Sequence, residues 1–265
     1  MTLNNNILEI IHLEKNYQDT KDEIKAIDDF SFKVEKGKFI SIVGPSGCGK
    51  STLLSILAKL ENRSSGEIKF NKENIVLGYM LQKDSLFPWL TILENCLLGL
   101  DIKGIKTEDN IHYVNYLLDS YGLSEFKNKY PNSLSGGMRQ RAALIRTLAI
   151  HPDILLLDEP FSALDAMTRV ALADDLYKMI KEEGKTVLMV THDIAEAVSL
   201  SDIVIVLTKR PATIKSVYEI NFENRKTPFE NRKRKEFSIY YDEIWRDLDV
   251  HIWWKKKILK KHKKR

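Results

Sequence analysis

The segment GPSGCGKST, residues 44–52, constrains the fold of this chain more than any other part of the sequence. It satisfies the pattern G-x-x-x-x-G-K-[S/T], whose glycines let backbone N–H groups curl around phosphate oxygens at the start of a helix. An apolar run at residues 39–43 precedes it, and apolar residues at helical spacing follow it from Leu53 to Leu60. The sequence therefore predicts a buried strand, a phosphate-binding loop and a helix in direct succession.

Each residue of this loop has an expected task in binding a nucleotide. The ammonium group of Lys50 is expected to reach the β- and γ-phosphates, and the hydroxyl of Ser51 is expected to ligate Mg²⁺. The other residues form the cradle around the phosphates: Gly44, Pro45, Ser46, Gly47, Cys48, Gly49 and Thr52.

Two carboxylates follow the apolar run ILLL at residues 154–157. An acid at the C-terminal end of a buried parallel strand lies where open α/β sheets bind ligands. Asp158 is expected to hold Mg²⁺, and Glu159 is expected to polarise the attacking water.

The string LSGGM at residues 134–138 predicts a second anion-binding helix start. Ser135, Gly136 and Gly137 place bare backbone N–H groups ahead of a helix whose apolar face begins at Ala142.

Apolar patterns predict an α/β core with a helical insertion. Short continuous runs at residues 154–157, 187–190 and 203–207 are typical of buried parallel strands. Helical patterns replace them between about 86 and 150, and a 3.6-residue rhythm from Phe237 to Ile252 predicts an amphipathic helix near the C-terminus. The alternation at residues 30–34 predicts a half-buried strand.

The net charge of +4 conceals a strongly basic tail. Residues 255–265 carry eight Lys and Arg residues and no acid, so residues 1–254 sum to 4 − 8 = −4. This tail could lie against an anionic membrane surface or stay solvated. Three observations bear on the location of the protein. No apolar run approaches the ~18 residues that cross a bilayer, and the start of the chain is unlike a secretory signal. The presence of only two cysteines favours a reducing compartment, so we expect a cytoplasmic location.

The motifs occur in the order found in ATP-binding cassette ATPases, which the chain resembles over nearly its whole length. The order is the phosphate loop, LSGGM, ILLLDEP, SALD at residues 162–165, and His192 after TVLMVT. The resemblance implies a P-loop NTPase fold, with a RecA-like α/β core, an antiparallel β region and a helical subdomain. It also implies an ATPase domain at residues 1–220 and a C-terminal helical extension with the basic tail at residues 221–265.

Two stretches resemble the ATPase subunits of bacterial nitrate, sulfonate and taurine importers: LFPWLTILEN after Gln82, and RPATI at residues 210–214. Met138 stands where the wider family more often has Gln, and this subgroup often has Met there. Family position implies that Gln82 meets Mg²⁺ and the attacking water, that His192 contacts the γ-phosphate, and that Tyr17 stacks on adenine.

The resemblance also implies that two identical cassettes meet head to tail. Ser135, Gly136 and Gly137 would contact ATP held by the phosphate loop of the other copy, and Asp165 would lie near the shared interface. ATP would then bridge two helix N-termini, and hydrolysis would remove the bridge.

The function implied is ATP hydrolysis coupled to solute import. The expected partners are a second copy of the chain, membrane-spanning permease subunits and, through them, an extracellular or periplasmic solute-binding protein. No specific nucleic acid is expected. The chain is expected to be a peripheral protein on the cytoplasmic face of the membrane. The alternative is a non-transport cassette ATPase acting on nucleic acid or ribosomes. A GTPase is disfavoured because the nearest string to N-K-x-D is NKEN at residues 71–74, and a small-molecule kinase would leave LSGGM unexplained.

Overall fold

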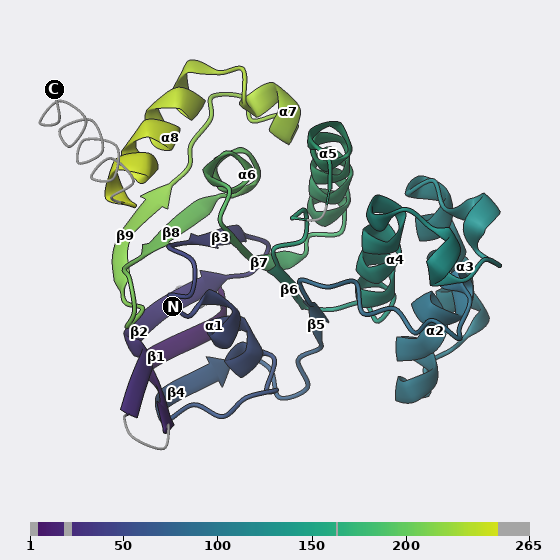
Figure 1. Cartoon of the computed structure of the whole chain (residues 1–265), viewed down its shortest axis with the longest axis horizontal. Helices are drawn as coiled ribbons and strands as arrows, with labels where there is room; N and C mark the ends of the chain where they lie inside the picture. The colour runs from purple at the N-terminus through teal and green to yellow at the C-terminus, as the bar shows by residue number, and fades with distance from the viewer. Residues whose placement is uncertain (1–4, 19–22, 163, 249–265) are drawn as a thin grey trace, which may run out of the picture. The chain divides into compact units, whose positions relative to one another are not determined.

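The computed structural model describes residues 5–18, 23–162 and 164–248 (Figure 1). Within it the chain forms two compact units, each built from separate stretches of sequence. Among the described residues, the first unit comprises those in the ranges 5–7, 35–38 and 70–189, and the second comprises those in the ranges 8–34, 39–69 and 190–248. The basic tail and Ile252, for which the sequence made predictions, lie outside the described residues.

A three-stranded sheet belongs largely to the second unit. Its order is β2-β1-β4, with β1 at Asn6–Gln18, β2 at Glu23–Glu35 and β4 at Ser65–Phe70 (Figure 1). The predicted strand around residues 30–34 is confirmed as the second half of β2, with Phe30 and Val34 fully buried.

The second unit also contains β3 at Phe39–Val43, β8 at Ile203–Leu207 and β9 at Ile214–Glu219. Strand β3 pairs with β8 in parallel, and β8 pairs with β9 antiparallel. All five residues of β3 are buried, as expected for a parallel strand covered on both faces. Helix α1, at Lys50–Leu57, follows the phosphate loop as predicted.

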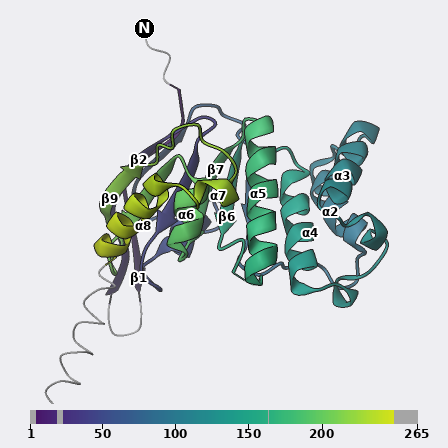
Figure 2. The same cartoon turned by 90° about the horizontal axis from the view of Figure 1, so that it is seen from above.

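Helices near the C-terminus cover α6, which spans Ile194–Leu200. Helix α7 at Pro228–Asn231 and helix α8 at Lys235–Asp247 lie beside it (Figure 2). On α8, the rings of Phe237, Tyr241 and Trp245 stack in series with 5.9 Å between successive centroids. The predicted amphipathic helix is therefore confirmed over its described part, with Ile244 fully buried in the same apolar cluster as Val198.

The first unit joins strands to the predicted helical segment. Strands β5 at Leu77–Met80 and β6 at Ile154–Asp158 pair in parallel, and β7 at Thr186–Thr191, which belongs to this unit as far as Met189, lies next to β6. The helices are α2 at Ile92–Lys103, α3 at Glu108–Ser120, α4 at Gly136–Leu148 and α5 at Ala166–Glu182, with short 3₁₀ turns at Ser124–Phe126 and Pro131–Ser133. In the part of the chain that the structure covers, no helix is both long and apolar enough to cross a membrane.

One buried amide shapes the loop that leads into α2. The amide oxygen of Asn95 accepts from the Phe87 N–H at 2.8 Å, and its amide nitrogen donates to the carbonyls of Phe87, Leu90 and Thr91 at 3.1, 3.1 and 2.9 Å. Asn95 is fully buried, so these bonds replace water for a turn that carries the exposed Trp89.

We predict that Asn95→Leu lowers the free energy of unfolding by about 1–3 kcal/mol, because it leaves buried backbone groups without partners. Hydrogen exchange at the Phe87 amide should accelerate in the same variant. The control is Asn128→Leu, a similar change at an exposed position. Equal stability of the two variants would contradict the assignment.

Candidate active site

The phosphate loop is preformed around its own lysine. Gly47 and Gly49 adopt φ values of 72° and 126°, which L side chains rarely adopt, and a Cβ on Gly49 would lie 2.9 Å from the Ala26 carbonyl oxygen. Lys50 is 6% exposed, and its Nζ donates to the carbonyls of Gly44 and Pro45 at 2.9 and 3.0 Å. The ammonium group therefore already lies inside the concave loop where phosphate oxygens would meet it.

Tyr17 lies beside this loop, next to α1. Its hydroxyl donates to Oγ1 of Thr52 at 3.4 Å, and Nζ of Lys15 lies 4.7 Å from the centre of its ring. Burial raises the pKa of the Tyr17 hydroxyl, and a hydrogen bond with Glu61 raises it further. The ring is 37% exposed, so part of it is open to a stacking partner.

The structure brings together two predicted catalytic residues, Gln82 and Glu159. Asp158 ends β6 and is only 5% exposed, and Glu159 follows it with a φ of 48°. Nε2 of Gln82 donates to Oε2 of Glu159 at 3.0 Å. This bond orients the Glu159 carboxylate, and a carboxylate has further lone pairs with which it can accept a proton from water.

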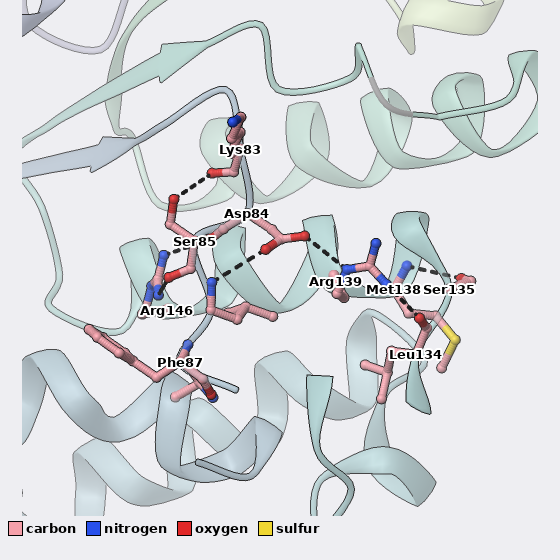
Figure 3. A network of polar contacts seen from close by, with 11 residues as sticks. Lys83, Asp84, Ser85, Phe87, Leu134, Ser135, Met138, Arg139 and Arg146 are labelled. Carbon is pink, nitrogen blue, oxygen red and sulfur yellow. Dashed lines mark hydrogen bonds and ion pairs between the residues drawn. The ribbon is translucent and has the colours of Figure 1, made fainter. Parts of the chain in front are cut away.

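Helix α4 holds the segment that follows Gln82 (Figure 3). Nε of Arg139 donates to Oδ2 of Asp84 at 2.9 Å. One turn from the other end of the helix, Arg146 donates to the carbonyls of Ser85 and Asp84, both at 2.8 Å. The two arginines thus fasten one segment to two places on α4.

The same helix also supports the residue after Glu159. Gln140 is 2% exposed, and its Nε2 donates to the Pro160 carbonyl at 2.8 Å. Sequence reasoning missed this residue and the Asp84–Arg139 pair. The available signal was polar residues next to the apolar face of α4, a weak one because helix surfaces are usually polar.

The predicted residues of LSGGM lie in one pocket with Asp165. This pocket has a volume of about 370 Å³ and is lined by Ser135, Gly136, Gly137 and Asp165, with Met138 among its other residues. The predicted helix start is present, with Ser135 as the N-cap of α4, and the Ser135 hydroxyl accepts from the Met138 N–H at 3.3 Å. The pocket therefore combines a helix start with open N–H groups and an acidic side chain.

Asp165 is itself an N-cap, at the start of α5. Its Oδ1 accepts from the N–H groups of Met167 and Thr168 at 3.1 and 3.0 Å. Hydrogen bonds from the side chain and backbone of Thr168 lower the pKa of Asp165, so the carboxyl stays charged at neutral pH.

His192 follows β7, as predicted, and lies in a tightly bonded turn before α6. Oγ1 of Thr191 donates to Oε2 of the buried Glu196 at 2.8 Å and accepts from the Asp193 N–H at 3.0 Å. The Asp193 side chain then accepts from the Glu196 N–H at 3.1 Å. The backbone on both sides of His192 is therefore fixed.

The predicted residues divide between the two units. The second unit contains Tyr17, the phosphate loop and His192, and the first contains Gln82, Asp158, Glu159, Asp165 and LSGGM. Among the described residues, no three His, Cys, Asp or Glu side chains form a metal-binding cluster. Mg²⁺ needs no such cluster, because it is held mainly by phosphate oxygens and water with one or two protein carboxylates, and the oxygen donors of Ser51, Gln82 and Asp158 suit it.

Comparisons with known proteins agree with these features. Residues 27–162 match the ABC transporter family. The chain is 45% identical to the uncharacterized ABC transporter ATP-binding protein YtlC of Bacillus subtilis, over 91% of this chain and 95% of that protein. It is 38% identical to the nitrate import ATP-binding protein NrtD of Synechocystis, over 89% and 93%.

A solved structure resembles the fold closely. It is a dimeric, post-hydrolysis state of the ATP-binding cassette MJ0796 bound to ADP and Pi. The TM-score is 0.72 at 33% identity, covering 82% of this chain and all of that one. The expected cassette fold is thereby confirmed, with its P-loop core and antiparallel β subdomain, and the chain belongs to the ABC transporter family as one of its ATP-binding ATPases.

Proposed function

We propose that this ATPase is the nucleotide-binding subunit of an importer for nitrate, a sulfonate or taurine. It works as a homodimer, coupling ATP binding and hydrolysis to solute uptake through separate permease subunits. The similarity to a nitrate import protein over 89% of the chain supports this solute class. The stretches LFPWLTILEN and RPATI are the parts of the chain that most resemble that subgroup.

The contact between Gln82 and Glu159 carries the catalytic part of the proposal. Glu159 accepts a proton from the attacking water, and Gln82 orients both the carboxylate and the water. Lys50 neutralises the β- and γ-phosphates, His192 contacts the γ-phosphate, and Tyr17 stacks on adenine. Ser51, Gln82 and Asp158 would hold Mg²⁺, which when bound neutralises the charge on the phosphates.

The dimer gives the pocket at LSGGM its role. Ser135, Gly136 and Gly137 line a space of about 370 Å³ at the start of α4, where the first N–H groups of a helix favour an anion such as the terminal phosphate of ATP on a second copy. Asp165, at the rim of the same pocket, lies at the proposed interface. The dimeric cassette with ADP and Pi supports this arrangement by similarity.

The permease contact is proposed to lie on residues 87–91, after Gln82. Trp89 there is 69% exposed, and its ring lies 5.2 Å from that of Phe87. A large exposed aromatic side chain on a rigid turn is a typical anchor for a partner protein. The chain would sit on the cytoplasmic face of the membrane, with an extracellular or periplasmic binding protein delivering solute to the permease.

Lys50→Met should weaken ATP binding by about 10- to 100-fold or more, because it removes charge-assisted hydrogen bonds to phosphate while keeping most of the length of the side chain. Isothermal titration calorimetry with Mg·ATP measures the change. The control is Lys36→Met, at an exposed position. Wild-type affinity in Lys50→Met would exclude this loop as the ATP site.

Glu159→Gln should reduce kcat by about 10²- to 10⁴-fold, because the amide cannot accept the proton of water. ATP affinity should be nearly unchanged, and light scattering should detect an ATP-dependent dimer that persists. Glu35→Gln, an exposed carboxyl, serves as the control. Hydrolysis at the wild-type rate would remove Glu159 from the mechanism, and a strictly monomeric variant would remove the dimer.

Trp89→Ala should leave the ATPase activity of the isolated protein unchanged but abolish co-purification with co-expressed permease subunits. Tyr116→Ala, which removes another exposed aromatic ring, should have no effect on either. Normal assembly of Trp89→Ala with the permease would place the contact elsewhere.

A further inference from the structure

The phosphate loop is backed by the segment that joins β8 to β9, residues 207–212. A Cβ on Gly44 would lie 3.1 Å from Cβ of Leu207, and a Cβ on Gly49 would lie 3.5 Å from Cβ of Ala212. Both ends of the loop therefore pack directly on this segment, and neither glycine leaves room for a larger residue without a shift.

Between these two contacts, Arg210 binds the tip of the loop. Its Nε and Nη2 both donate to the Gly47 carbonyl, at 3.2 and 2.8 Å. The bonds come from a charged donor, which makes them stronger than bonds between neutral groups. None of the roles assigned to the nucleotide-site residues involves this arginine.

The turn that presents Arg210 is itself held on both sides. The Ala212 N–H donates to the Ala26 carbonyl at 2.9 Å, and the Asp28 N–H donates to the Ala212 carbonyl at 3.0 Å, which ties the turn to β2. Within the turn, Oγ1 of Thr208 donates to the Pro211 carbonyl at 2.9 Å. The backbone of the turn that contains Arg210 is therefore held in place.

The orientation of one peptide group explains what this contact does. In a trans peptide the C=O and the N–H point in opposite directions. The Gly47 carbonyl points out toward Arg210, so the N–H of Cys48 points into the loop, where it donates to the Pro45 carbonyl at 3.3 Å. That bond is long, and an incoming phosphate oxygen would be a better acceptor.

We propose that Arg210 is a positioning residue of the ATP site, which holds the Gly47 carbonyl outward and so keeps the N–H groups of the phosphate loop directed at the phosphates. The inference rests on the proposed binding of ATP by this loop and adds a residue outside every motif that predicted it. Arg210 acts through the loop backbone, so its loss affects nucleotide affinity more than kcat.

Arg210 also affects the pKa of Tyr17, the residue proposed to stack on adenine. Burial and Glu61 raise the pKa of the Tyr17 hydroxyl, whereas the positive charge of Arg210 lowers it. The charge of Arg210 therefore acts on Tyr17, while its hydrogen bonds act on Gly47.

The test compares three variants of the full chain. Arg210→Ala should raise the Kd for Mg·ATP about tenfold, with kcat at saturating ATP within about twofold of wild type. Arg210→Gln should recover part of the affinity, because its Nε2 takes the place of the arginine Nε, 3.2 Å from the Gly47 carbonyl, although the shorter bond from Nη2 and the charge are lost. Lys209→Ala removes the neighbouring exposed charge and should bind ATP like wild type.

A second readout needs no nucleotide. The two cysteines of the chain, Cys48 in the loop and Cys96 in α2, are 1% and 0% exposed. Maleimide should label Cys48 about tenfold faster in Arg210→Ala, since loop opening is no longer opposed by the lost bonds, while Cys96 serves as the internal control.

Wild-type affinity and wild-type Cys48 labelling in Arg210→Ala would overturn the inference. So would equal loss of affinity in Lys209→Ala, or a Gln variant as weak as the Ala variant, since either result would make bulk charge the cause. Failure of the unmodified protein to bind ATP would instead contradict the proposed function, and the labelling experiment would still decide the role of Arg210.

Discussion

A row of peptide groups with their N–H bonds directed into one concave turn is the constraint on which this protein depends. Such a turn needs left-handed residues, which Gly47 and Gly49 supply, and firm supports at both ends. Strand β3 provides one, since all its residues are buried and it pairs with β8. Helix α1 provides the other and adds the partial positive charge of its N-terminus. An anion can therefore bind to a loop that is already ordered, which avoids an entropic cost.

In the first unit, helix α4 has a comparable organising role. Its first residues line the pocket that also contains Asp165. Arg139 and Arg146 bind the segment after Gln82, and Gln140 supports the residue after Glu159. A displacement of α4 would strain all of these contacts together. The pocket and the Gln82–Glu159 pair are thus linked physically through one rigid element.

The sequence predicted most of the elements that carry the site, because buried strands and amphipathic helices leave periodic patterns. It also located Gln82 and Glu159 from their positions in motifs. Their contact follows from the sheet, since β5 and β6 run in parallel and both residues lie just beyond the ends of these strands. Strand β5 itself went unpredicted because it has only four residues, one of them glycine.

The sequence did not predict individual hydrogen bonds between residues far apart in the chain. Arg210 and Gly47 are 163 positions apart, and the Asp84–Arg139 pair is 55 apart. Arg210 opens the stretch RPATI, which indicated a family subgroup, but an arginine on a surface turn has no periodic partner, so the sequence did not indicate that it binds Gly47. The roles of Tyr17, His192 and Asp165 stay predictions from family position, although the structure places each in a well-defined setting.

The burial of Ile244 on α8 has a practical consequence for the design of shortened versions of this protein. Ile244 is fully buried in a cluster that includes Val43, the last residue before the phosphate loop. A truncation upstream of α8 would expose that apolar surface to water and invite aggregation. Shortened versions intended for crystallisation should therefore retain the chain through Asp247, where α8 ends.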